Sequence, residues 1–334
     1  CIRDSGDAHC VLLVDRALEV LPPELAGTCE QVTWVLPDDV ARYSVLVEPS
    51  PMTASPEPLL ALLQSSAHKV AIVFDFIPAH YPTIYLRHPA ARVEYAAQLD
   101  ALRHYDEFIG ISHLAIAELR GVLDRELEAG KAITTSVGWP SDVFPSGTST
   151  PPAKGTGPIV IMTGDEGRKN TFGALAAIGV ATAGDESRDV VVLGMAGQGV
   201  KVHHWSIAAV MRPGEATTLD RVSDEEMHRV LTDASLVVVT SFDEGLSLPV
   251  IEALASGAPV VASDIAAHRE LIGTGSFLVP AGDIAATAKA IRRHARRATT
   301  QQQQLRVLQQ HDHADLEPLI ADSVRAHRAG GAPD

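Results

Sequence analysis

The sequence has 334 residues, 46% of them hydrophobic and 21% charged, which is typical of a globular protein with more than one core. Its formal net charge of −15 argues against nucleic acid as a partner and against stable docking on an anionic membrane. No apolar run approaches the roughly 18 residues of a membrane span, and no charged-then-apolar leader opens the chain. We therefore expect a cytoplasmic protein without a transmembrane segment, and transient membrane association stays open.

The first part of the chain alternates short apolar runs with helical patterns. Strands are predicted over residues 11–14, 31–36, 44–47 and 70–75, and helices over 56–69 and 90–103. This alternation favours an α/β sheet. The three cysteines, Cys1, Cys10 and Cys29, form no Cys-x-x-Cys pair and suit a reducing compartment.

A segment rich in proline and glycine, residues 138–158, interrupts the alternation and indicates a linker. Strands are then predicted over 159–162, 190–193, 236–239 and 276–279, with helices from about 170, over 198–211 and from 223. The sequence therefore predicts a first domain over residues 1–150, a second over 151–300 and a helical tail over 301–334.

One stretch of the second domain, from Ser235 to Asp264, reads as strand, polar turn, short helix and strand. Ser247 can cap the helix, whose first turn tolerates Pro249, and Gly257 with Pro259 ends it. Turns of this kind at the carboxyl edge of a parallel sheet bind ligands, and free amides at the helix start favour an anion such as phosphate.

Two carboxylates flank this helix start: Glu244 in the turn and Glu252 about one and a half turns inside the helix. Carboxylates beside a phosphate site make sense if they accept hydrogen bonds from sugar hydroxyls, so the pattern indicates a nucleotide sugar. The competing interpretation is a loop charge at Glu244 and a solvated helix face at Glu252. The apolar neighbours of Glu252 disfavour a solvated face.

The residues from Glu244 to Asp264 resemble the donor-site motif of family 4 retaining glycosyltransferases, in which seven residues separate two glutamates. The resemblance implies the GT-B fold, with two Rossmann-like α/β domains whose parallel sheets face each other across a cleft. It also implies transfer of a sugar from a nucleoside-diphosphate sugar to a hydroxyl acceptor, such as a glycan, a lipid-linked saccharide or a natural product. The polysaccharide or glycoconjugate produced is not indicated.

The resemblance also implies roles for individual residues. Glu252 would hold the ribose hydroxyls and Glu244 would face the donor sugar ring. The backbone amides of the turn would contact sugar and phosphate; they are those of Gly245, Leu246, Ser247 and Leu248. The family often has Phe-Gly where this chain has Leu246 and Ser247.

A second loop with the composition of a phosphate-binding site follows the predicted strand over 159–162. Its glycines, Gly164 among them, let the backbone approach a ligand, and Arg168 and Lys169 supply positive charge. Taken alone, the loop could be an ordinary surface turn. By resemblance, Lys169 and a nearby arginine neutralise the donor diphosphate; many members have that arginine where this chain has Gly164, so Arg168 would serve.

These cations and amides would stabilise the leaving nucleoside diphosphate. The resemblance therefore implies a metal-independent hexosyltransferase with no cofactor beyond its donor substrate, and no protein nucleophile is named.

The segment 72–82 is similar to the amino-domain signature of the same family, with Phe74 where relatives often have histidine or tyrosine. Asp75 is a candidate active-site residue or a cap of the turn before Pro78. Ser112 matches a family serine that leads into a helix. The usual opening strand and glycine-rich loop are not recognisable, so we expect a truncated or unusual amino terminus.

Two rival functions stay open. A nucleotide-sugar epimerase or hydrolase would use the same architecture. A catalytically weak subunit that binds a nucleotide sugar or a partner is favoured by Phe74 and by the missing glycine-rich start. The histidines at positions 80, 113, 203, 204, 311 and 313 are interpreted as surface or loop residues rather than metal ligands. The nucleotide base, the sugar, the acceptor and the oligomeric state are not indicated.

Overall fold

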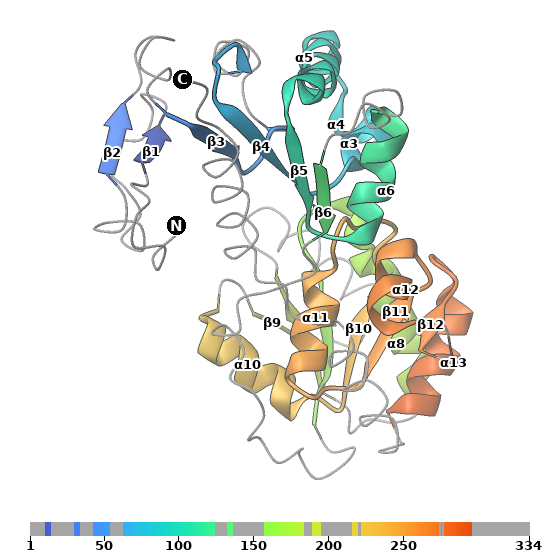
Figure 1. The fold of residues 1–334 in the computed structure, drawn as a ribbon. Helices are drawn as coiled ribbons and strands as arrows, with labels where there is room; N and C mark the ends of the chain where they lie inside the picture. The colour runs from blue at the N-terminus through green and yellow to red at the C-terminus, as the bar shows by residue number, and fades with distance from the viewer. Residues whose placement is uncertain are drawn as a thin grey trace. The chain divides into compact units, whose positions relative to one another are not determined.

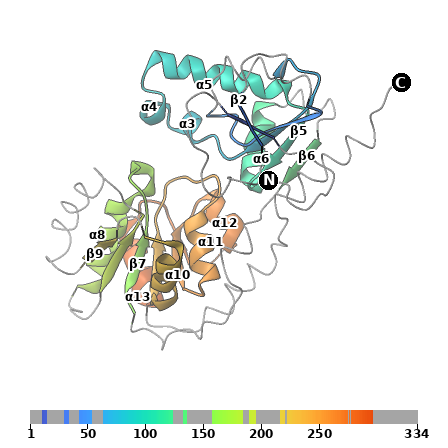
Figure 2. The same ribbon diagram turned by 90° about the vertical axis from the view of Figure 1, so that its left-hand side faces the viewer.

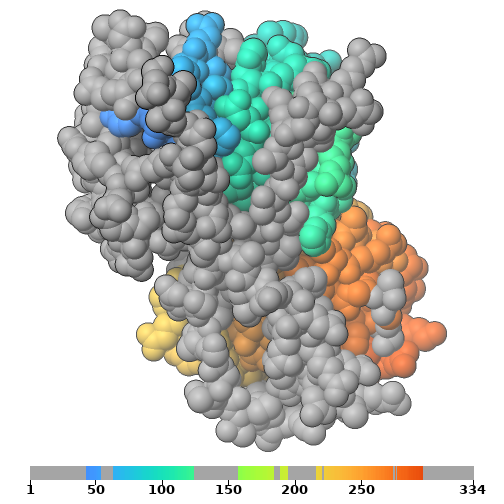
Figure 3. Space-filling view, in the orientation of Figure 1, coloured from blue at the N-terminus to red at the C-terminus, as the bar shows by residue number. Residues whose placement is uncertain are grey.

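The computed structural model describes residues 11–14, 30–33, 43–53, 63–123, 132–135, 157–183, 189–194, 216–219, 222–273, 275 and 277–295. All other residues are grey in Figure 3. The described residues fall into two compact units, one before and one after the boundary between Trp139 and Pro140. The predicted domain boundaries at 150 and 300, the tail over 301–334 and the helix over 198–211 lie outside the described residues and stay predictions.

The first unit contains a parallel four-stranded sheet with the order β3-β4-β5-β6 (Figure 1). Its strands are β3 (Val45–Glu48), β4 (His68–Val73), β5 (Glu107–Gly110) and β6 (Ala132–Thr135). Two further strands, β1 (Val11–Val14) and β2 (Glu30–Thr33), pair with each other in parallel. The helical elements are α3 (Ile77–His80), α4 (Pro82–Tyr85), α5 (Pro89–Ala101), η1 (Leu102–His104) and α6 (His113–Val122).

Two local predictions for this unit can be compared with the structure. Ser112 begins α6, and its hydroxyl accepts a hydrogen bond from the Ala115 amide at 3.0 Å, which confirms a serine at that helix start. The helix predicted over 56–69 was wrong at its end, because β4 already begins at His68. The backbone of Lys69 is held in the sheet by Asp106, whose carboxylate accepts from the Lys69 amide at 2.8 Å.

The second unit contains a parallel six-stranded sheet with the order β12-β11-β10-β7-β8-β9. Its strands are β7 (Ile159–Met162), β8 (Val190–Leu193), β9 (Ala216–Leu219), β10 (Leu236–Val239), β11 (Val260–Ser263) and β12 (Leu278–Val279). Figure 2 labels two of these strands, β7 and β9, together with the helices around them. Every residue of β7, β10 and β11 is buried, as expected for apolar, β-branched runs at the centre of a parallel sheet. The predicted strands over 159–162, 190–193 and 236–239 are confirmed.

Helices surround this sheet. They are α8 (Thr171–Thr182), α10 (Asp224–Asp233), α11 (Leu248–Ala255), α12 (Ala266–Ile272) and α13 (Ile284–His294), with the short η2 (Gly167–Lys169) before α8. Helices α8 and α13 pack together and share one apolar core with the strands, whereas α11 contacts α10 and α12. Ser223 begins α10 and accepts from the Glu226 amide at 3.2 Å, which confirms the predicted helix start.

The strand order places a topological switch between β7 and β10. From β7 the chain proceeds to β8 and β9 on one side, whereas β10, β11 and β12 extend the sheet on the other side. β7 and β10 are parallel neighbours, with Ile159 opposite Leu236 and Ile161 opposite Val238. The loops that follow these two strands therefore start side by side at the carboxyl edge, where open α/β sheets bind ligands.

Candidate functional site

The two loops at the switch point are joined by hydrogen bonds to backbone carbonyls. The Phe242 amide donates to the Arg168 carbonyl at 2.7 Å. The side chain of Asn170 donates to the Thr240 carbonyl at 3.2 Å, and the Thr240 hydroxyl donates to the Asn170 carbonyl at 3.0 Å. Asn170 is left-handed at φ 53, a conformation that asparagine tolerates better than most residues. These bonds hold the η2 turn against the loop after β10.

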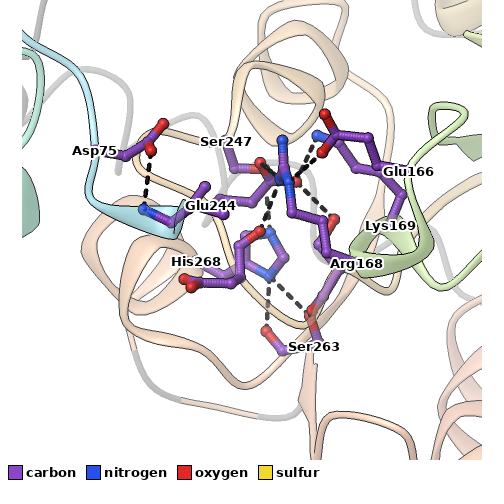
Figure 4. A network of polar contacts seen from close by, with 11 residues as sticks. Asp75, Glu166, Arg168, Lys169, Glu244, Ser247, Ser263 and His268 are labelled. Atoms are coloured by element: carbon purple, nitrogen blue, oxygen red, sulfur yellow. Dashed lines mark hydrogen bonds and ion pairs between the residues drawn. The ribbon is translucent and has the colours of Figure 1, made fainter. Parts of the chain in front are cut away.

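Glu244 receives hydrogen bonds from both cations of the facing loop (Figure 4). Its two carboxylate oxygens lie 2.6 Å from Arg168 Nη1 and 2.6 Å from Lys169 Nζ. The Ser241 hydroxyl donates to the same carboxylate at 2.6 Å. Only 5% of the Glu244 side chain is exposed, against 15% for each cation. Both cations predicted to meet a diphosphate thus meet a buried carboxylate in the ligand-free protein.

The electrostatics keep this carboxylate ionised. Burial acts to raise the pKa of the Glu244 carboxyl, but Lys169, Ser241 and Arg168 outweigh burial and lower that pKa below its ordinary value. Arg168 makes two more contacts: Nε donates to Glu166 at 2.6 Å and Nη1 donates to the Asp243 carbonyl at 2.9 Å. The guanidinium is therefore fixed from three directions, and its position is set before any ligand arrives.

Glu252 has the opposite environment. It lies on α11, is half-buried, and its carboxylate makes no hydrogen bond or ion pair within the described part of the chain. Burial is the main reason that its pKa is raised above the ordinary value; the charge of Asp224 acts in the same direction and Lys169 opposes it. A half-buried carboxylate with unused acceptor capacity can bind hydroxyl groups of a ligand.

The start of α11 differs from the prediction in one respect. Ser247 occupies the N-cap position, but its side chain makes no capping hydrogen bond, so the expected capping hydroxyl was wrong. The hydroxyl instead lies 3.1 Å from His268 Nε2, and the side chain is fully buried. Only the backbone of Ser247 is left to face a ligand. Helix α11 ends as predicted, with Gly257 at φ 76 beyond it.

The amides of this turn differ in availability. The Leu248 amide donates to the Leu246 carbonyl at 3.1 Å, whereas the amides of Leu246 and Ser247 have no hydrogen-bond partner within the described residues. These two amides belong to the same turn as Glu244, which bonds to Arg168 and Lys169, so the turn combines hydrogen-bond donors with positive charge in a way suited to an anion. Gly245 is buried beside them. A Cβ at Gly164 would meet Lys169 only at 3.5 Å, which is ordinary contact.

Sequence reasoning missed three residues that connect the site internally: Ser241, Ser263 and His268. His268 is fully buried on α12, and its Nδ1 lies 2.7 Å from the Ser263 carbonyl. The Ser263 hydroxyl donates to the Ser241 carbonyl. The sequence contains one signal for this arrangement, a histidine that follows three apolar residues at the start of a helix. Its partners could not be found without the order of the strands.

Asp75 belongs to the first unit and caps its own turn there. Its carboxylate accepts from the Ile77 amide at 3.0 Å, directly before Pro78, which agrees with the capping interpretation. Phe74 beside it is 45% exposed. A catalytic role of Asp75 stays a prediction.

Among the described residues, no group of three histidines, cysteines, aspartates or glutamates could hold a metal ion, and positions 203, 204, 311 and 313 lie outside this part of the chain. No helix in the same residues combines the length and apolar character needed to cross a membrane.

Comparisons with known proteins agree with this geometry. Residues 158–297 match the protein family described as glycosyl transferases group 1. The chain is 33% identical over 98 residues to the putative glycosyltransferase EpsD of Bacillus subtilis, a match that covers 29% of this chain and 26% of that protein. It is 30% identical over 127 residues to the O-antigen chain mannosyltransferase B of Escherichia coli, covering 38% of this chain and 33% of that protein.

Among solved structures, an alpha,alpha-trehalose 6-phosphate synthase from Burkholderia multivorans superposes with a TM-score of 0.62 at 15% identity. The superposition covers 82% of this chain and 70% of the synthase. At this level of identity the likeness concerns the fold. The matched stretches span a third or less of the two curated relatives, so their activities apply only to those proteins.

Proposed function

We propose that the chain is a glycosyltransferase, because residues 158–297 match the glycosyl transferases group 1 family and the chain has the GT-B fold. It transfers a sugar from a nucleoside-diphosphate sugar to a hydroxyl acceptor, with retention at the anomeric carbon. The observation that carries this proposal is the meeting of Arg168 and Lys169 with the loop after β10 at the switch point of the six-stranded sheet.

The diphosphate binds between the two loops of this switch point. Arg168 and Lys169 supply positive charge, and the amides of Leu246 and Ser247 supply hydrogen-bond donors. Charge builds up on the diphosphate as the bond to the anomeric carbon breaks, so donors held in place beforehand stabilise the transition state more than the ground state. The two fixed cations take the part that a divalent metal plays in other transferases, and the reaction needs no metal.

The two glutamates divide the remaining parts of the donor. Glu252, half-buried and with free acceptor capacity, accepts hydrogen bonds from the ribose hydroxyls. Glu244 faces the sugar ring once the diphosphate has taken over its cations. This assignment follows the family motif, in which the first glutamate contacts the sugar and the second the nucleotide.

A mannosyl donor is the first one to test. The O-antigen chain relative of Escherichia coli is named as a mannosyltransferase, so GDP-mannose leads a panel that also contains UDP- and dTDP-sugars. Calorimetric titration with GDP, UDP and dTDP tests nucleotide binding independently of the acceptor. Binding of none of the three would overturn the proposal. The anomeric configuration of a product, read by NMR, tests retention.

A second candidate is a catalytically weak subunit that binds a nucleotide sugar. The exposed Phe74, where relatives often have histidine or tyrosine, favours it. The two candidates separate in a hydrolysis assay: an enzyme releases sugar slowly from its donor without acceptor, whereas a binding subunit holds the donor intact. Restoring histidine by Phe74→His should raise turnover if the first candidate is correct. A cytoplasmic location stays a prediction of the sequence.

A further inference from the structure

His268 is a fully buried titratable residue next to the proposed donor site, and the proposed chemistry does not use it. Although its side chain has no contact with solvent, both of its ring nitrogens have hydrogen-bond partners. We propose that His268 is a positioning residue for the donor loop, defined here as residues 241–248. This inference rests on the proposed binding of a nucleoside diphosphate at that loop.

The hydrogen-bond partners of the His268 ring determine which of its two nitrogens carries the hydrogen. A carbonyl oxygen can only accept, so Nδ1, 2.7 Å from the Ser263 carbonyl, carries the hydrogen. Burial lowers the pKa of His268 to about 4, although its bond to the Ser263 backbone acts in the other direction, so the ring is neutral at pH 7. Nε2 is then an acceptor and takes the hydrogen of the Ser247 hydroxyl at 3.1 Å.

His268 and its partner Ser263 hold the two ends of the donor loop by hydrogen bonds. Ser247 at its end is held by Nε2 of His268, and Ser241 at its start is held through its carbonyl by the Ser263 hydroxyl. The Ser263 hydroxyl also lies 3.2 Å from Nδ1 of the histidine. Ser241 in turn donates to Glu244, so the network extends to the carboxylate of the site.

This arrangement affects the amides of the loop. A serine at an N-cap position normally turns its hydroxyl oxygen toward the amides of the first helical turn. Here the Ser247 hydroxyl bonds to His268 instead, while the Ser247 amide has no hydrogen-bond partner among the residues that the structure describes. Without the acceptor on the histidine, the Ser247 hydroxyl loses its partner, and the loop loses one of the two hydrogen bonds that hold its ends.

Two substitutions of His268 separate positioning from packing, because asparagine places its amide near Nδ1 and glutamine near Nε2. His268→Gln keeps an acceptor for Ser247 and should bind GDP, UDP or dTDP, whichever the wild type binds, nearly as well as the wild type. His268→Asn keeps the donor to the Ser263 carbonyl but leaves Ser247 free. We expect its affinity to fall by about tenfold, the order of one lost buried hydrogen bond.

Ser247→Ala removes the same bond from the other side and should lose the same affinity. In the double variant with His268→Asn the loss should not increase, because both changes delete one interaction. Ser256→Ala is the matched control: Ser256 is also buried, lies at the opposite end of α11, and its hydroxyl is 3.2 Å from His228 Nδ1. It should lower the unfolding temperature but leave nucleotide affinity unchanged.

The outcomes distinguish the hypotheses. Wild-type affinity in Ser247→Ala, equal affinity of the two His268 variants, or an equal loss in Ser256→Ala would each overturn the positioning role while nucleotide binding itself stands. Thermal unfolding of each variant shows whether a loss of affinity comes from a loss of folded protein. Absence of nucleotide binding in the wild type would overturn the proposed function and this inference with it.

Discussion

Glu244 Oε1 lies 2.6 Å from Lys169 Nζ, and the opposite oxygen of the same carboxylate lies 2.6 Å from Arg168. In the ligand-free protein this carboxylate therefore binds the two cations to which we assign the donor diphosphate. If the diphosphate binds there as we propose, it has to displace Glu244 from at least one of them. The free energy of nucleotide binding thus contains the cost of breaking charged hydrogen bonds that are individually worth about 1.5–3 kcal/mol.

The first prediction concerns this competition. Glu244→Gln removes the charge that holds Arg168 and Lys169, so free nucleoside diphosphate should bind about tenfold more tightly, which equals about 1.4 kcal/mol. Turnover of the nucleotide sugar should fall, because Glu244 is also the residue assigned to the sugar ring. Calorimetry with the free nucleotide and a steady-state assay with the donor measure the two effects.

Glu166→Gln is the control for this prediction. Glu166 also pairs with Arg168, at 2.6 Å, but half of its side chain is exposed. Exposed ion pairs add little interaction energy. The affinity of Glu166→Gln for free nucleoside diphosphate should therefore stay close to that of the wild type. Weaker nucleotide binding by Glu244→Gln would show that Glu244 assists the diphosphate rather than competing with it.

The second prediction concerns Glu252. If it holds ribose hydroxyls in the substrate and in the transition state alike, Glu252→Ala mainly raises the Michaelis constant. The affinity for free nucleoside diphosphate should fall by roughly ten- to a hundredfold, the value of a charged hydrogen bond. Glu225→Ala, an exposed carboxylate on α10, is the comparison. Unchanged affinity in Glu252→Ala would remove this residue from the nucleotide site.

The third prediction is a pH dependence of stability that originates from His268. The ring has an ordinary pKa of 6.5 and a folded-state pKa of about 4. Between these values the unfolded chain binds the proton and the folded chain does not, so the free energy of unfolding falls as the pH is lowered. The difference between the two pKa values corresponds to about 3 kcal/mol of the free energy of unfolding. Above pH 6.5 this contribution is fully present.

Denaturant unfolding of the wild type and of His268→Gln from pH 7 to pH 4 measures this effect. The stability advantage of the wild type over the variant should shrink steadily as the pH falls, because glutamine does not titrate. A difference that stays constant over the whole range would contradict a buried, neutral histidine at this position.

The fourth prediction concerns metal removal. Arg168 and Lys169 stabilise the leaving diphosphate in this proposal, so turnover should be unchanged in EDTA. Lys169→Ala should lose about a hundredfold or more in turnover, the typical effect of removing one preorganised charge-stabilising group. Added magnesium should not restore it. A wild-type enzyme that stops in EDTA and recovers with magnesium or manganese would refute this account of the leaving group.

The most apolar strands could be predicted from sequence, whereas two edge strands, β6 and β9, could not. β7, β10 and β11 lie inside the sheet and consist almost entirely of buried apolar residues, so each is recognisable as a short β-branched run. β9 and β6 lie at sheet edges and contain alanine and threonine in place of a valine run. Their strand conformation depends on pairing with a neighbour, and pairing is not visible in a local pattern.

The same limit applies to the site. The sequence predicted site residues in two separate loops, Arg168 and Lys169 in one and Glu244 in the other, and treated all three as partners of a ligand. Their contact with each other follows from the adjacency of β7 and β10, which is a property of strand order. Ser247 was expected to cap α11 for a related reason: its actual partner, His268, comes from a different helix.

The switch between β7 and β10 also has a consequence for folding. Lys169 and Glu244 are 75 residues apart in the chain, and the strands that carry them become neighbours only when the chain returns past β8 and β9. Closing such a long loop is entropically costly, and contacts of this separation form late in folding. The contact between the loops after β7 and β10 should therefore be absent from early folding intermediates, and pulse-labelling hydrogen exchange should show the Phe242 amide, which donates to the Arg168 carbonyl, gaining protection after the amides of α8.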